Sequence, residues 1–368
     1  MHPAYADRRE RAQTRLRERG ADAAVAYPGP NLQYFTGFRG EPVDRFHALY
    51  LPAEGEGTLV TPDGYLTQAR TNASVERFRT VEGNDPAAVA TALADLFGEG
   101  DRLLVDDDAL YALTGPLSAA VGAESVRSAA PVFRAMRRRK DETEVAALER
   151  SAAVADEVSE AVRALGSEAV GMTEAELATE IRGELHARGA RGVAFDVVVG
   201  SGPNGADPAL RFSDREIRAG EPVVVDFGCF LDGYASDQTR TVVFEGDPPS
   251  PFPDVHEAVL DALDAGVDAA EPGATAGDVD AAARETLAER GYGDRFTHPT
   301  GHGVGLASHE PLAIAEGDET PLEAGMVFSV EPGVYFEDEF GVRVEDLVVI
   351  TDDGCERLND SPRTWKPL

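Results

Sequence analysis

Four acidic residues lie inside or at the ends of strongly apolar, strand-like segments, where carboxylates are unusual. Asp226 ends VVVD, Asp237 opens SDQTRTVVF, Glu331 ends VFSVE and Glu345 interrupts VRVEDLVVI. Burying an unpaired carboxylate is costly, so each of these positions needs a compensating partner. Four carboxylates that converge on one site would repel one another unless cations neutralise them, and the pattern therefore predicts a metal centre.

The first two acids are spaced so that one hairpin would bring them together. If the chain turns at Asp232-Gly233, Asp237 lies opposite Gly228 on the neighbouring strand. Gly228 is two residues after Asp226, and alternate residues of a strand share a face. The spacing therefore predicts that Asp226 and Asp237 are diagonal neighbours on one face of the hairpin.

A salt bridge is the structural alternative for any single acid, because Arg240 and Arg343 lie in the same segments. Such ion pairs also bury carboxylates. They account poorly for four acids in matched positions of two similar segments, so we favour metal ligation for the set. Asp346 directly follows Glu345, but strand alternation sends it to the other face, and we leave it out of the site.

The glycine-rich segment THPTGHGVGLASHE adds three histidines, at positions 298, 302 and 309. We predict that His302, which lies between two glycines, is the fifth ligand. A glycine-rich segment can instead bind phosphate, but no lysine follows this one and the strand–loop–helix pattern is missing. Carboxylate oxygens with one imidazole favour Mn²⁺, Co²⁺ or Fe²⁺ over a structural zinc site, which prefers sulfur and nitrogen.

The charge balance excludes some partners and indicates a habitat. With 67 acidic and 34 basic residues the formal net charge is −33, which repels nucleic acid and anionic lipid. Only Lys140 and Lys366 are lysines, and this composition is typical of proteins from salt-loving cells, where salt screens the repulsion. A hydrophobic content of 42% argues against disorder. Without a membrane-length apolar run or an apolar leader, we expect a cytoplasmic protein.

The elements that would position these residues fall into two domains, because 368 residues exceed one ordinary core. Residues 1–130 are predicted to form a smaller α/β domain, and residues 131–368 a larger one that begins with a long alanine-rich helix after Asp141. In the first domain an opening helix is expected, followed by the strands Ala23–Tyr27, Ala48–Leu51, Thr58–Thr61 and Arg102–Val105, and the helices Pro86–Phe97 and Leu110–Val121.

The second domain contains an internal repeat with an offset of 102 residues. Gly171–Gly189 aligns with Gly273–Gly291, and each copy predicts a helix ended by glycine. A hairpin pattern follows each helix. The first comprises Val223–Phe227 and Thr239–Phe244, and the second comprises Val327–Tyr335, a turn near Glu337–Gly341, and Val342–Ile350. The repeat predicts a duplicated half-domain with the site at the seam.

The segments VVVDFGCFLDGYASDQTRT, THPTGHGVGLASHE, VFSVEPGVYF and GVRVEDLVVI resemble those of the pita-bread metallopeptidases. This family includes methionine aminopeptidase, Xaa-Pro aminopeptidase and prolidase, with creatinase as a relative that lacks metal. NLQYFTGF resembles the creatinase-type N-terminal domain, which methionine aminopeptidases lack, so the Xaa-Pro branch is favoured. The resemblance implies an α/β (α+β) fold in which a duplicated pita-bread catalytic domain follows a smaller creatinase-like domain.

The resemblance also implies roles for single residues. Asp226 would bind one metal ion and His302 with Glu331 the other, while Asp237 and Glu345 would bridge them, with Mn²⁺ favoured and Co²⁺, Fe²⁺ or Zn²⁺ as alternatives. A hydroxide shared by the metals would attack the peptide carbonyl. Glu331 would also transfer a proton to the leaving amine. His309 would stabilise the oxyanion, and His298 and Arg343 would bind substrate or orient a ligand. A homodimer is expected.

One family position is not matched. Relatives carry a histidine after the proline in a segment like GPNGADPALRFSD, where this chain has Ala209, seventeen residues before Asp226. In the family this histidine contacts substrate, and losing it costs about 10²–10⁴-fold if it serves in acid–base catalysis. Two explanations stay open: Arg211 occupies the gap, or the enzyme has moved to another substrate. The metal site is unaffected by either.

Three functions remain open from sequence. The first is an Xaa-Pro aminopeptidase or prolidase-like dipeptidase that removes N-terminal residues from peptides. The second is a small-molecule lyase or C–N hydrolase, because one fold hosts several reactions. The third is a non-catalytic binding protein, which the five retained ligand positions argue against.

Overall fold

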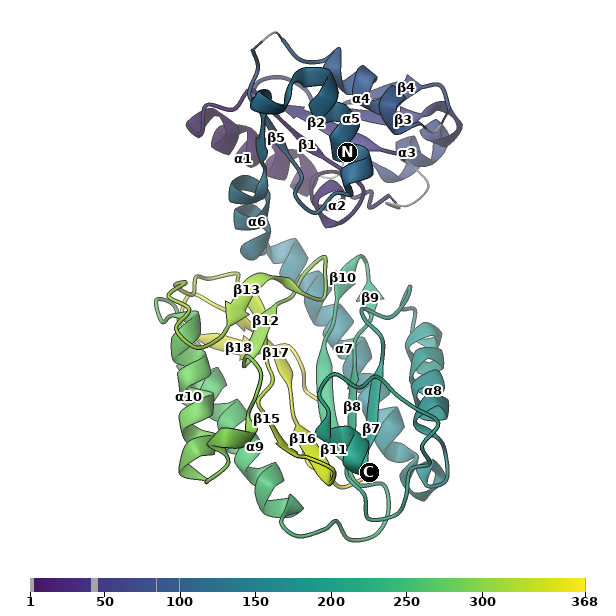
Figure 1. Cartoon of the computed structure of the whole chain (residues 1–368), viewed down its shortest axis with the longest axis vertical. Helices are drawn as coiled ribbons and strands as arrows, with labels where there is room; N and C mark the ends of the chain where they lie inside the picture. The colour runs from purple at the N-terminus through teal and green to yellow at the C-terminus, as the bar shows by residue number, and fades with distance from the viewer. Residues whose placement is uncertain (1–2, 41–45, 84, 99, 368) are drawn as a thin grey trace. The chain divides into compact units, whose positions relative to one another are not determined.

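The computed structural model describes residues 3–40, 46–83, 85–98 and 100–367. The chain divides into two compact units, Met1–Arg137 and Arg138–Leu368 (Figure 1). Within the described ranges, no helix combines the length and apolar character needed to cross a bilayer.

The first unit is built on a six-stranded sheet with strand order β4-β3-β2-β1-β5-β6. Its strands are β1 (Ala23–Ala26), β2 (Ala48–Pro52), β3 (Thr58–Pro62), β4 (Arg77–Val81), β5 (Leu103–Val105) and β6 (Val126–Ser128). Its helices are α1 (Pro3–Glu18), α2 (Pro30–Thr36), α3 (Leu66–Asn72), α4 (Pro86–Ala94), α5 (Tyr111–Val121) and α6 (Ala130–Arg138), with 3₁₀ turns η1 (Asp63–Tyr65) and η2 (Ala123–Ser125). The four predicted strands are confirmed. The sequence does not reveal β4 and β6, because these edge strands are largely exposed and carry few apolar residues.

The second unit begins with the predicted long helix, α7 (Glu142–Ala164), which Asp141 caps through a complete capping box. The first half continues with η3 (Gly166–Ala169), α8 (Glu174–Ala187), β7 (Val198–Ser201), η4 (Gly202–Ala206), β8 (Val223–Phe227), β9 (Phe230–Leu231), β10 (Tyr234–Ala235) and β11 (Gln238–Val242). The second half contains α9 (Phe252–Ala269), α10 (Ala276–Glu289), η5 (Gly293–Arg295), β12 (Gly301–Gly303), β13 (Glu310–Ile314), β14 (Val327–Val330), β15 (Gly333–Phe336), β16 (Phe340–Arg343), β17 (Asp346–Ile350) and β18 (Cys355–Arg357).

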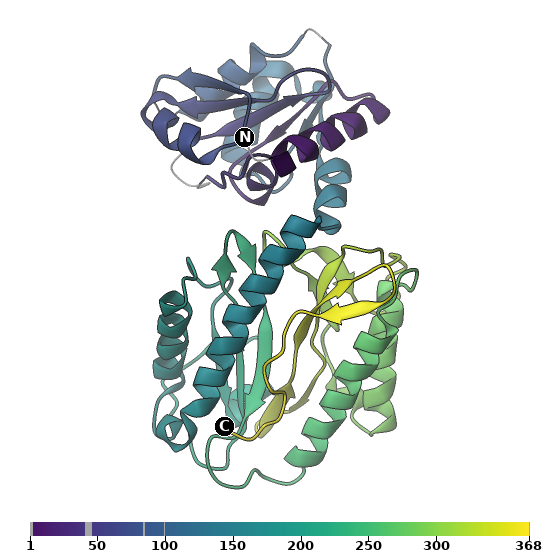
Figure 2. The same ribbon diagram turned by 180° about the vertical axis from the view of Figure 1, so that it is seen from behind.

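The two halves repeat one plan, as the internal repeat predicts. Helices α8 and α10 start 102 residues apart, and Thr173 and Thr275 cap them with the same kind of capping box. In Figure 2, α7 runs across the strands of the first half, and α9 with α10 flanks the second half. Each half has its own apolar core, so the acids between the halves lie outside either core.

The first hairpin has the predicted register. Gln238 pairs with Phe227 in the antiparallel ladder, so Asp237 and Gly228 are the next two residues opposite each other. Asp232 and Gly233 both adopt positive φ, at 51° and 87°, as a tight hairpin turn requires. A Cβ on Gly228 would lie 1.8 Å from the Ser236 carbonyl oxygen, so the crossing of the chain there requires glycine.

The second hairpin differs from the prediction at its turn. The sequence pattern extends the turn to Gly341, but β16 already begins at Phe340 and Gly341 pairs with Tyr335. The glycine has another purpose, because a Cβ there would lie 1.9 Å from the Gly205 carbonyl oxygen. Gly341 thus allows η4 to pack directly against β16.

Candidate metal centre

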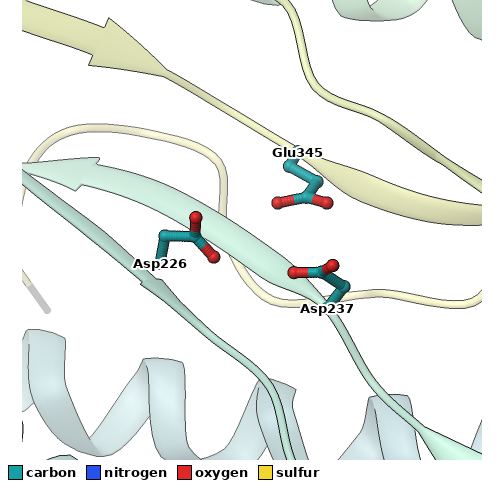
Figure 3. Close-up of side chains that lie close together, drawn as sticks. All are labelled: Asp226, Asp237 and Glu345. Carbon is teal, nitrogen blue, oxygen red and sulfur yellow. The ribbon is translucent and has the colours of Figure 1, made fainter. Parts of the chain in front are cut away.

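Three carboxylates from the two halves meet between the strands. Asp226 lies in β8, Asp237 directly precedes β11, and Glu345 lies between β16 and β17. One oxygen from each lies within 4.8 Å of the others. Figure 3 shows the three carboxylates directed toward a common space. Asp237 and Glu345 are buried, and Asp226 is partly buried.

His302 and Glu331 complete the predicted set. His302 Nε2 lies 3.7 Å from Asp237 Oδ2 and 3.4 Å from Glu331 Oε1. Ser329 ties these two residues together, since its Oγ accepts from the His302 backbone N–H and donates to Glu331 Oε1. The structure therefore brings all five predicted residues into one cluster.

The electrostatics of this cluster suit a cation. Burial, and then the charges of Glu345, Asp226 and Glu331, raise the pKa of Asp237 well above its usual value. Burial likewise raises the pKa of Glu345 and brings the pKa of Glu331 to about 7. Burial lowers the pKa of His302, which favours the neutral imidazole that can ligate metal.

Two oxygen atoms in the cluster have no hydrogen-bond partner within the described ranges. Asp226 Oδ1 and Glu345 Oε1 are buried and accept no hydrogen bond from the described part of the chain. Such orphaned acceptors are rare in proteins, and a bound cation would satisfy them. The donor set of carboxylate oxygens with one neutral imidazole fits divalent ions of the Mn²⁺, Co²⁺ or Fe²⁺ type.

In the part of the chain that the structure describes, one acid of the four forms a salt bridge with an arginine. Arg343 Nη2 lies 2.7 Å from Asp226 Oδ2. Among the described residues, no arginine forms a salt bridge with the Asp237 or Glu345 carboxylate; Glu345 Oε2 accepts from the Thr239 hydroxyl instead. Arg240, the second arginine of these segments, donates to the Glu345 backbone carbonyl.

Asp346 faces away from the cluster, as strand alternation predicts. It is fully buried, and its carboxylate forms ion pairs with Arg240 at 3.0 Å, Arg363 at 2.6 Å and Arg357 at 3.4 Å. Two neighbouring acids therefore have opposite surroundings: arginines neutralise Asp346, whereas Glu345 faces other acids.

The other predicted site residues lie in two groups around the cluster. The exposed His309 stacks on His302, with ring centroids 3.7 Å apart and an interplanar angle of 20°. His298 Nε2 shares a hydrogen bond of 2.8 Å with the Tyr335 hydroxyl, and Arg343 donates to the same hydroxyl at 3.0 Å. Tyr335 thus joins His298 and Arg343, and the sequence does not reveal it because a strand tyrosine has no distinctive spacing.

Ala209, where relatives carry histidine, is exposed in the loop after η4. Its backbone N–H donates to Asp207 Oδ1 at 2.9 Å. The loop is anchored by buried Glu174, whose carboxylate accepts from Ser201 and Ser213. Partial desolvation of the exposed His309 ring, and then its proximity to His302, lower the pKa of His309, and the positive charge of Arg211 adds to this.

Comparison with known proteins gives two family matches. Residues 146–352 match the model of metallopeptidase family M24, and residues 8–139 match that of the creatinase/prolidase N-terminal domain. A probable dipeptidase PepE of Mycobacterium tuberculosis is 40% identical over 365 residues, covering 97% of this chain and 95% of that protein. An Xaa-Pro dipeptidase of Pyrococcus horikoshii is 34% identical, covering 93% of each chain. The crystal structure of a prolidase from Thermococcus sibiricus superposes with a TM-score of 0.91, at 34% identity over 99% of both chains.

Proposed function

Because the chain belongs to metallopeptidase family M24, and its two domains are those of a prolidase-like hydrolase, we propose that it cleaves Xaa-Pro dipeptides. Its similarity to proteins named dipeptidase and Xaa-Pro dipeptidase supports this substrate over longer Xaa-Pro peptides. The observation that carries the proposal is the cluster of acids from both halves, with two oxygen atoms that lack a protein partner among the described residues.

Five residues would hold two divalent ions: Asp226, Asp237, His302, Glu331 and Glu345. Mn²⁺ is the ion we favour, with Co²⁺, Fe²⁺ or Zn²⁺ as alternatives, because oxygen ligands predominate. When bound, such ions polarise the scissile carbonyl and lower the pKa of the attacking water. In the part of the chain that the structure describes, Asp237 and Glu345 lack an arginine salt bridge, which supports this role over a structural one.

Protein side chains would provide proton transfer, oxyanion stabilisation and substrate binding. Glu331 would carry a proton to the leaving amine, because its side chain is 16% exposed and so more accessible than that of Asp237 at 5%. His309 presents its imidazole beside His302, where a ring N–H would stabilise negative charge on the substrate oxygen. His298 and Arg343, joined by Tyr335, would bind the second substrate residue and hold Asp226 in place.

We also propose a homodimer that works in a salt-rich cytoplasm. The scarcity of lysine and the net charge of −33 support this environment.

The test is hydrolysis by protein that has been stripped of metal and reloaded with Mn²⁺ in concentrated salt. Xaa-Pro dipeptides, longer Xaa-Pro peptides and Xaa-Ala dipeptides form the substrate panel. We expect turnover of the Xaa-Pro dipeptides only with metal. A protein that retains metal but cleaves no peptide would indicate a lyase or C–N hydrolase. A protein that retains no metal would indicate a binding function.

A further inference from the structure

Lys140 is one of only two lysines in this chain, and it is buried in an ion pair. Its Nζ lies 3.1 Å from Glu310 Oε2, and the two side chains are 2% and 4% exposed. The other lysine, Lys366, is exposed, and arginine fills every other basic position. An ammonium is more compact than a planar guanidinium, and at position 140 it lies buried against one carboxylate oxygen.

The backbone of Lys140 is held as firmly as its side chain. Its N–H donates to the Gly325 carbonyl at 2.7 Å. Gly325 has a φ of 87°, and a Cβ there would lie 2.6 Å from the Lys140 carbonyl oxygen. Lys140 also directly precedes Asp141, the N-cap of α7. The ammonium therefore projects from a fixed point of the backbone.

Glu310 uses its other oxygen to hold a loop. Its Oε1 accepts from the Leu306 backbone N–H at 3.0 Å. The carboxylate lies directly against Gly305, where a Cβ would be 2.7 Å from Oε1. The Gly305 carbonyl in turn accepts from the Ala235 N–H at 2.8 Å. One carboxylate thus connects the ammonium of Lys140 to the start of the loop 305–309.

That loop ends at His309, which adjoins Glu310 in the chain and stacks on His302 at 3.7 Å. We propose that Lys140 and Glu310 are positioning residues, whose buried ion pair holds the 305–309 loop so that the His309 imidazole lies over the metal cluster. The role of His309 in hydrolysis rests on the proposed function, whereas the hold of the ion pair on the loop does not.

The pair works through geometry more than through net stability. A buried ion pair contributes little to stability overall, but removing one partner takes a compensating charge away from the other. Without the ammonium, the Glu310 carboxylate loses the contact that positions its Oε2 atom, so its Oε1 atom is held less firmly against the Leu306 N–H. A displacement of about 1 Å at a catalytic group costs up to about 100-fold in rate.

The test begins with Lys140→Met. Lys366→Met is the matched control, because it removes the chain's other lysine, and Arg139→Met breaks the exposed ion pair with Glu323 at the adjacent position. Hydrogen–deuterium exchange of the metal-free protein should show faster exchange in the 303–310 segment of Lys140→Met alone. Unchanged exchange there would overturn the proposal, whatever the enzyme's activity.

Kinetics separate positioning from general damage. We expect Lys140→Met to lower kcat for dipeptide hydrolysis by about 10- to 100-fold, with KM and metal content nearly unchanged. In a His309→Ala background the same substitution should have no further effect, whereas a general structural defect would lower kcat in both backgrounds and contradict the proposal. Wild-type protein without dipeptidase activity would refute the proposed function, and hydrogen exchange would still decide the role of the pair.

A double variant guards against a failure to fold. Lys140→Met combined with Glu310→Gln removes both charges of this pair, and the amide oxygen of the substituted side chain can still accept from the Leu306 N–H. We expect this variant to fold and to recover part of the lost kcat. A double variant as slow as Lys140→Met, with the segment 303–310 fully protected from exchange, would show that the loop is held in another way and would overturn the proposal.

Discussion

Replacing Asp237 with asparagine is expected to stabilise the protein when divalent metal is absent. Carboxylate oxygens of Asp226, Asp237 and Glu345 lie within 4.8 Å of one another. At that distance, two unit charges in an effective dielectric of about 20 repel by about 3.5 kcal/mol. The substitution removes two of the three pairwise repulsions. Protons already relieve part of the repulsion, because burial and neighbouring acids raise the pKa of Asp237. We therefore expect a gain of about 2–4 kcal/mol at neutral pH, less than the sum of both repulsions.

Thermal unfolding with a chelator and with Mn²⁺ measures this effect. Mn²⁺ should raise the unfolding midpoint of the wild type, since a ligand that binds only the folded state stabilises it. It should have little effect on Asp237→Asn, which lacks one ligand. Asp346→Asn is the matched control, because Asp346 is also buried but pairs with three arginines. That substitution should destabilise the protein under both conditions. If Asp237→Asn destabilised the chelated protein as Asp346→Asn does, the acids would be structural and our reasoning would be wrong.

Three further predictions concern single residues. Glu331→Gln should lower turnover of an Xaa-Pro dipeptide by about 10²–10⁴-fold in a folded protein, and near-normal turnover would exclude Glu331 as the proton carrier. Ala209→His should raise Xaa-Pro dipeptide turnover by up to about 100-fold, whereas an unchanged rate would indicate that another group, such as Arg211, serves there. Burial lowers the pKa of His256 to about 4, so the unfolded chain binds a proton near pH 6.5 that the folded protein does not bind. Stability should therefore fall by about 3 kcal/mol as the pH drops from about 6.5 to about 4, and His256→Phe should reduce this loss in acid unfolding measurements.

The register of the first hairpin was predictable because its causes are local. Asp232 and Gly233 adopt the positive φ values that a tight turn requires, and strand alternation then assigns a face to each residue that follows. The position of Asp237 opposite Gly228 follows from these two facts alone. The same alternation correctly separates Asp346 from Glu345.

Other parts of the site depend on contacts that have no local pattern. The Tyr335 hydroxyl forms hydrogen bonds with both His298 and Arg343, and no residue spacing in the sequence predicts these contacts. Lys140 and Glu310 are 170 residues apart, and only the folded chain brings them together. The sequence pattern assigns Gly341 to a turn, yet this glycine permits the close approach of the Gly205 backbone. Sequence patterns identify ligand residues that occupy matched positions in repeated strands. The residues that orient these ligands are identified only by the contacts in the folded structure.

The acidic residues of this chain lie both at the surface and in the buried cluster, and we expect salt to affect these two groups differently. Surface carboxylates repel one another across water. At physiological ionic strength, monovalent salt largely screens this repulsion between charges that are more than about 8–10 Å apart. The cluster of Asp226, Asp237 and Glu345 is largely buried, where screening is weak. Added KCl should therefore stabilise chelated wild type and chelated Asp237→Asn by similar amounts, leaving the difference between their unfolding midpoints nearly constant. If concentrated KCl abolished that difference, the cluster would be accessible to monovalent ions. Salt would then screen the acids of the site in the same way as the acids at the surface. A constant difference, removed only by Mn²⁺, would mean that salt maintains the fold while the divalent metal neutralises the centre.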